Sequence, residues 1–131
     1  MDAARALDEA RTILASLQAA VDARDVDSLA RLFDDGAVLV GTAGDGRDAE
    51  GLRRYVTAVA TQPGSLRWEW DELAPFHESE GMLGFAAFGE VVLEEGDVVQ
   101  RAPIRVTIFA VRQANGWRMR QFHGSIPTGV S

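Results

Sequence analysis

Two side chains near the end of the chain, His123 and Arg105, carry groups that catalysis and ligand binding commonly use. An imidazole exchanges protons near neutral pH and can act as a general base or a hydrogen-bond donor. A guanidinium keeps its charge in any environment, so a buried one must meet an anion. If both side chains face one apolar cavity, they would suit an organic ligand with a carbonyl or acidic group. They are therefore the candidate catalytic residues.

The alternation of side chains along a strand decides which residues accompany this pair. His123 lies on a final predicted strand from Trp117 to Ser125, and we expect its face to turn toward the helices because Met119 shares that face. The residues that share a strand face with either of the two are further candidate ligand-binding residues. They are Trp117 and Gln121 on the face of His123, and Thr107 and Phe109 on the face of Arg105.

Each member of the pair also has a purely structural interpretation. His123 would then be a core histidine whose ring bonds to a carbonyl or to the neighbouring strand. Arg105 would form an internal salt bridge with an acid such as Glu69 or Glu90. Glu90 is also the nearest candidate for an acid inside the cavity, and the sequence leaves open which face of its strand it occupies.

Aromatic residues form a second candidate group. Trp68 and Trp70 lie two residues apart and so project from one strand face, while Tyr55 and Phe33 belong to predicted helices. Together they would make a wall for a planar or hydrophobic ligand. Packing in the core explains them equally well.

The composition argues against several other kinds of site. The chain has no cysteine, and its two histidines, His77 and His123, show no HxH or HExxH spacing, so we expect no metal. The segment 41–46, GTAGDG, lacks the GxGxxG pattern and the Lys-Ser/Thr ending of phosphate loops. We expect no cofactor.

Charge and hydropathy limit the partners. A net charge of -7 argues against nucleic acid, whose backbone needs a basic surface. Residues 37–40 illustrate the longest wholly apolar runs, which are too short to span a membrane. Charged residues such as Asp2 and Arg5 interrupt any signal peptide, so a cytoplasmic protein is expected.

The elements that must position these residues follow from periodicity. Apolar residues recur at three- and four-residue steps over 3–23, which predicts an amphipathic helix. Asp25 is a predicted N-cap for a short second helix ending at Phe33, and Asp48 for a third that stops before Pro63-Gly64. A short buried strand at 37–40 lies between them.

From residue 66 the period changes from 3.6 to 2, which predicts strands. Long strands are expected at 66–71, 81–94, 99–112 and 117–125, with a hairpin at Ala114-Asn115-Gly116. Helices followed by a run of strands indicate one α+β domain, residues 1–131.

The strand at 99–112 is apolar on both faces, with Ile104, Val106 and Ile108 on one and Thr107, Phe109 and Val111 on the other. The helices can cover only one face. A second copy of the sheet is the expected cover for the convex face, which predicts a homodimer. The alternative is a monomer that tolerates exposed aliphatic side chains.

Four stretches resemble the SnoaL-like branch of the nuclear transport factor 2-like superfamily. They are the passage 25–38, the helix from Gly51-Leu52, the strand segment Arg105-Val106-Thr107, and the closing segment 116–125, GWRMRQFHGS. The family's G-x-E lead-in to its third helix is here Gly46-Arg47-Asp48. The resemblance implies a cone with a cystatin-like fold. Three N-terminal helices would pack on a highly curved mixed or antiparallel sheet of five to six strands, around a deep pocket.

The resemblance does not imply one activity. Members include isomerases, polyketide cyclases, dehydratases and hydrolases, as well as non-catalytic binding or assembly domains. One interpretation is a small-molecule-binding protein, with an isomerase, cyclase or hydrolase activity on a hydrophobic carbonyl- or acid-bearing ligand. The other is a non-catalytic ligand-binding or assembly module. The last strand has no acid, and the full ketosteroid-isomerase set is absent from a chain with one tyrosine, Tyr55. The missing carboxylates favour the second interpretation.

Overall fold

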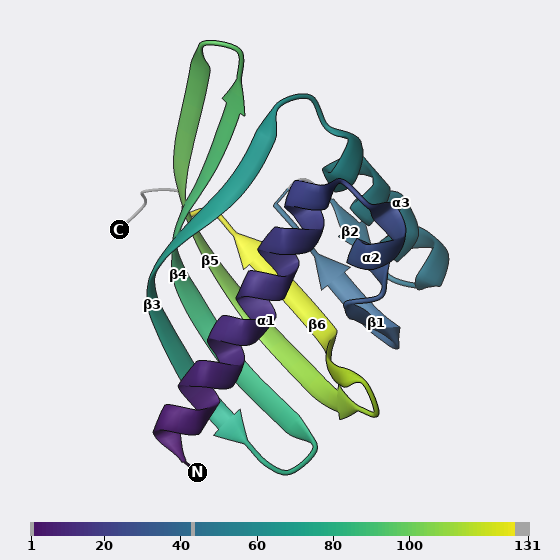
Figure 1. Cartoon of the computed structure of the whole chain (residues 1–131), viewed down its shortest axis with the longest axis vertical. Helices are drawn as coiled ribbons and strands as arrows, with labels where there is room; N and C mark the ends of the chain where they lie inside the picture. Colours follow the sequence, from purple (N-terminus) through teal and green to yellow (C-terminus); the bar gives the residue numbers. More distant parts are fainter. Residues whose placement is uncertain (1, 43, 128–131) are drawn as a thin grey trace.

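The computed structural model describes residues 2–42 and 44–127 and shows three helices and six strands in this part of the chain (Figure 1). The helices are α1 (Ala3–Ala23), α2 (Val26–Ala30) and α3 (Ala49–Thr61). The strands are β1 (Phe33–Val40), β2 (Asp45–Gly46), β3 (Ser65–Glu78), β4 (Met82–Glu95), β5 (Val98–Gln113) and β6 (Gly116–Ser125). None of the helices in these residues combines the length and apolarity needed to cross a membrane.

An aspartate caps the start of each helix. The Asp2 carboxylate accepts a hydrogen bond from the Arg5 N–H, and the Asp48 carboxylate accepts one of 2.8 Å from the Gly51 N–H. Asp25 caps α2, as predicted. These bonds satisfy backbone donors that have no partner within the helix. The extent of α1 agrees with the predicted range.

The second helix is shorter than predicted, because the chain enters the sheet earlier. Phe33 was expected to end the helix, but it begins β1 and pairs with Met119 of β6. The Met119 N–H also donates to the Leu32 carbonyl at 2.7 Å. This contact with a strand distant in sequence overrides the local helical pattern.

The sheet is mixed, with the strand order β2-β1-β6-β5-β4-β3. β1 runs parallel to β6, and the other neighbouring pairs are antiparallel. The hairpin at Ala114-Asn115-Gly116 joins β5 to β6, and Gly116 adopts a φ of 120°, which disfavours residues with a side chain. The mixed sheet of six strands confirms the predicted fold class.

Interruptions in the strand register bend the sheet. β3 carries an extra residue near Asp71 and another near Phe76, and β6 carries one at Arg120. Such bulges increase the twist of a strand and reverse the faces of the residues that follow. Figure 1 shows α1 crossing one face of the sheet, with α2 and α3 on the side of β1 and β2. We call this covered face the inner face and the opposite one the outer face.

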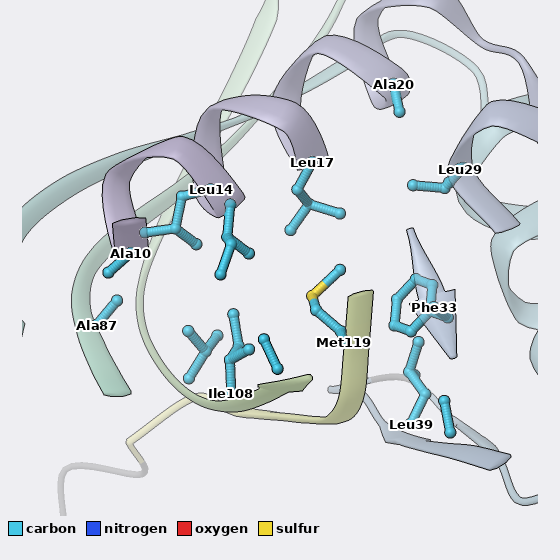
Figure 2. Close-up of a cluster of buried hydrophobic side chains, with 14 of the residues drawn as sticks. Ala10, Leu14, Leu17, Ala20, Leu29, Phe33, Leu39, Ala87, Ile108 and Met119 are labelled. Atoms are coloured by element: carbon cyan, nitrogen blue, oxygen red, sulfur yellow. The ribbon is translucent and has the colours of Figure 1, made fainter. Parts of the chain in front are cut away.

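The core lies between α1 and the inner face of the sheet. Figure 2 shows Leu14 and Leu17 of α1 directed toward Ile108 of β5 and Met119 of β6. Burying a side chain of this size contributes about 1.5–3 kcal/mol. Gln18 also fastens α1 to the edge strand: its amide donates to the Leu66 carbonyl at 3.0 Å and accepts from the Trp68 N–H at 2.9 Å. The backbone groups of this edge are thereby paired.

Candidate ligand-binding cavity

A cavity of about 680 Å³ lies between the helices and the inner face of the sheet. This volume is within the range of sites for drug-sized molecules. Every layer of the fold contributes to it. The helices and the C-cap of α3 supply Leu17, Val21, Leu29, Tyr55, Val56, Val59 and Gln62, and the strands with their flanking residues supply Phe33, Leu39, Gly41, Thr42, Leu66, Trp68, Val91, Leu93, Gln100, Arg101, Ala102, Ile104, Phe122, Gly124 and Ile126.

Aliphatic and aromatic side chains dominate this lining. Within residues 2–42 and 44–127 it contains no Asp, Glu or His. The same residues contain no cluster of three His, Asp or Glu side chains that could hold a metal ion. Among the described lining residues, only Tyr55 therefore has a side chain that commonly serves as a general acid or base.

Arg101, the one charged residue among the described lining residues, directs its charge away from the cavity. Its guanidinium bonds to Glu69 at 2.8 Å and to Glu90 at 3.3 Å. Arg101 pairs in register with Val92 of β4, on the outer face, where both acids also lie. Its hydrogen bond holds the pKa of Glu69 below the ordinary value of 4.5, and Arg67 adds to the effect. Arg101 is thus neutralised outside the cavity.

Tyr55 brings a hydroxyl to the cavity wall. It lies on α3 four residues before Val59, so one face of the helix presents both side chains to the cavity. The phenol oxygen rests against Gly41, where the Cβ of any other residue would overlap it. Burial raises the pKa of Tyr55 above its ordinary value of 10.0, so the phenol is neutral at physiological pH.

The structure places three of the predicted ligand-binding residues at the cavity: Phe33, Tyr55 and Trp68. Trp70 is not among the lining residues, and its ring stacks on that of Trp68 with centroids 6.4 Å apart. Trp117 is also outside the cavity, with the Arg112 guanidinium 4.4 Å from its ring centroid.

The prediction that His123 faces inward is wrong. Ala110 pairs with Met119 and Phe109 pairs with Gln121, so Arg120 is an extra residue in β6. Strict alternation from Met119 would keep His123 on the inner face, but the bulge moves it to the outer face. His123 is exposed there, opposite Thr107.

Arg105 lies on the same outer face and does not reach the cavity. It is exposed, and its Nε donates to the Ser125 hydroxyl at 3.0 Å. Its inner-face neighbours on β5, Ile104 and Val106, are buried instead. The two candidate catalytic residues therefore share the outer face.

The other predicted ligand-binding residues also lie on the outer face. Thr107 and Phe109 accompany Arg105, and Gln121 follows the bulge. The Phe109 ring meets Phe76 edge-to-face at 5.3 Å. Glu90 is bound to Arg101 as described, so it is not an acid inside the cavity.

Several lining residues were not predicted from the sequence. Phe122 and Gly124 reach the cavity only because of the bulge at Arg120. Leu93 and Ala102 belong to the arm formed by the end of β4 and the start of β5. The alternation of inner and outer faces that places Ile104 on the inner face could have predicted their position. The inner face of the sheet therefore extends beyond the region that α1 covers.

A family model for the SnoaL-like domain matches residues 10–129. The chain belongs to the SnoaL-like family. This match covers nearly the whole length, so the resemblance seen in the four short segments is confirmed. A comparison with curated proteins gave no match.

Solved structures with the same fold are distant in sequence. A nuclear transport factor 2-like family protein from Streptomyces avermitilis has a TM-score of 0.82 at 10% identity, over 95% of this chain and 98% of its own. A nuclear transport factor 2-like protein of unknown function from Pseudomonas putida has a TM-score of 0.74 at 19% identity, over 92% and 85%. One with a cystatin-like fold from Novosphingobium aromaticivorans has a TM-score of 0.73 at 11% identity, over 97% and 85%. At these identities the similarity shows the fold alone.

Proposed function

We propose that this SnoaL-like domain binds a predominantly apolar small molecule in its cavity without transforming it. The observation that carries the proposal is a cavity of about 680 Å³ whose lining is mostly aliphatic and aromatic. A ligand that buries about 300 Å² of apolar surface there gains about 7.5 kcal/mol, from which the costs of association are subtracted.

An isomerase, cyclase or hydrolase activity in the cavity has less support. It depended on His123 and Arg105 meeting a ligand inside the cone, and both lie on the outer face. The non-catalytic interpretation needs only the cavity and its apolar walls.

The proposal includes a second copy of this chain as the cover for the outer face. Phe76 and Phe88 are 50% and 41% exposed there. Phe88 stands in one register row between Glu72 of β3 and Arg105 of β5. A two-fold axis parallel to the strands would place Glu72 of each copy over Arg105 of the other. In this register row the face is therefore complementary to itself in charge.

A pair of variants on α3 tests the cavity as the binding site. Val59→Trp places an indole in the cavity, whereas Ala58→Trp places the same group on the exposed side of the helix. We expect Val59→Trp to weaken binding of the neutral probe N-phenyl-1-naphthylamine about tenfold, because displacing about 60 Å² of buried probe surface costs about 1.5 kcal/mol.

Probe fluorescence measures this affinity, and circular dichroism checks that both variants fold. Ala58→Trp should bind the probe as the wild type does. Equal affinity in both variants would place the probe outside the cavity and contradict the proposal.

A further inference from the structure

The Tyr55 hydroxyl is a polar group without an assigned role in a mostly apolar wall, in which Thr42, Gln62 and Gln100 are the other neutral polar residues among those described. Among residues 2–42 and 44–127 it forms no hydrogen bond. By contrast, the other hydroxyls on α3 are engaged: Thr57 donates to the Arg53 carbonyl at 2.7 Å, and Thr61 donates to the Thr57 carbonyl at 2.7 Å. A half-buried hydroxyl that lacks a protein partner has hydrogen-bonding capacity to offer a ligand.

The position of this hydroxyl is set by its surroundings. The ring lies on the backbone at Gly41, which also lines the cavity, and near Gly44. A side chain at Gly41 would occupy the place of the phenol oxygen. The glycine therefore allows the phenol end of the ring to approach the backbone at a position that also lines the cavity.

Within the described part of the chain, the cavity lining offers no unpaired positive charge to accompany this donor. The Arg101 guanidinium is bound to Glu69 and Glu90, and Arg105 lies on the outer face. A carboxylate that entered would lose its hydration without gaining a cationic partner, which is costly. A neutral carbonyl oxygen would lose little and would accept a hydrogen bond from the phenol.

We propose that Tyr55 is the polar anchor of the cavity and that its ligand is an uncharged, largely apolar molecule with a carbonyl-type hydrogen-bond acceptor. This inference rests on the proposed function, since it names the ligand class of the same site. Of the carbonyl-bearing and acidic ligands expected for His123 and Arg105 from the sequence, it retains only the carbonyl-bearing one.

Three probes of nearly equal shape test the inference. 2-Acetylnaphthalene carries a neutral carbonyl, 2-isopropylnaphthalene replaces it with an apolar group, and 2-naphthoate replaces it with a carboxylate. Their dissociation constants are measured at pH 7 for the wild type, Tyr55→Phe and Thr57→Val. The last variant removes a hydroxyl from the same helix outside the cavity.

We expect Tyr55→Phe to weaken 2-acetylnaphthalene binding about 2- to 12-fold, the net contribution of one neutral hydrogen bond, and to leave 2-isopropylnaphthalene unchanged. The unchanged affinity for the hydrocarbon also shows that the variant is folded. Thr57→Val should match the wild type with all probes. For the wild type, 2-naphthoate should bind at least about tenfold more weakly than the ketone.

Two kinds of failure are distinguishable. If the hydrocarbon binds but Tyr55→Phe weakens both neutral probes equally or neither of them, or if the carboxylate binds best, the anchor is overturned while the apolar cavity stands. If none of the three probes binds to the wild type, the proposed function itself is contradicted.

Discussion

At the scale of single residues, Asp25 shows how one carboxylate shapes the chain. It accepts hydrogen bonds from the N–H of Asp27 at 3.1 Å and of Ser28 at 3.3 Å, and from the Ser28 hydroxyl at 2.8 Å. The bonds from Ser28 contribute most to lowering the pKa of Asp25 below its ordinary value of 3.8. The charged cap fixes the start of α2, which carries Leu29 into the cavity wall.

A lowered pKa makes this contribution dependent on pH. The stability from charged Asp25 is fully present above the unfolded value of 3.8 and is lost as the pH falls through the lower folded value. We expect Asp25→Ala to lower the thermal midpoint of unfolding at pH 7. The difference in midpoint between the variant and the wild type should become smaller below pH 3.8. Scanning calorimetry across this range measures the difference.

Asp35→Ala provides the matched control. It removes an equal charge from an exposed position of β1. We expect it to change the midpoint little at any pH. A difference for Asp25→Ala that stays constant into the acid range, or that Asp35→Ala reproduces, would show that the cap is not the cause.

At the scale of elements, most of the helices and strands could be predicted because their signals are local, but the two-residue strand β2 was not. An aspartate before an apolar period, or a glycine at a hairpin, acts on residues a few positions away. The bulge at Arg120 has no such signal, since it exists only in the pairing of β6 with β5. One inserted residue moved Gln121 and His123 to the outer face and brought Phe122 to the cavity. Part of the candidate site was therefore out of reach of the sequence.

The outer face of the sheet is the element on which the proposed dimer depends. We expect the wild type to sediment at twice the 14.2 kDa mass of the chain. Phe88→Glu should weaken the dimer at least about tenfold, because it buries an unpaired carboxylate. Analytical ultracentrifugation over a concentration series measures both.

Val98→Glu is the control for this change. Val98 is 59% exposed at the tip of the β4–β5 arm and away from Phe88 in the register, so the same substitution there should preserve the dimer. A wild type that sediments as a monomer, or a Phe88→Glu protein that stays dimeric, would contradict the proposed interface.

At the scale of the whole molecule, the cavity exists because the layers cover the sheet unevenly. The N-terminal half of α1 packs tightly on the inner face, with Ala10 and Leu14 buried. Farther along, the β4–β5 arm and α3 diverge around the space lined by Trp68 and Tyr55. The same fold therefore supplies a filled core at one end and a binding space at the other.

The most direct measurement is a crystal structure of the protein soaked with 2-bromonaphthalene, in which anomalous scattering locates the bromine. We expect one strong bromine position inside the cavity, among Trp68, Tyr55 and Phe122. Bromine found only on the outer face near Phe76 and Phe88, or a cavity closed by its own side chains, would contradict the account.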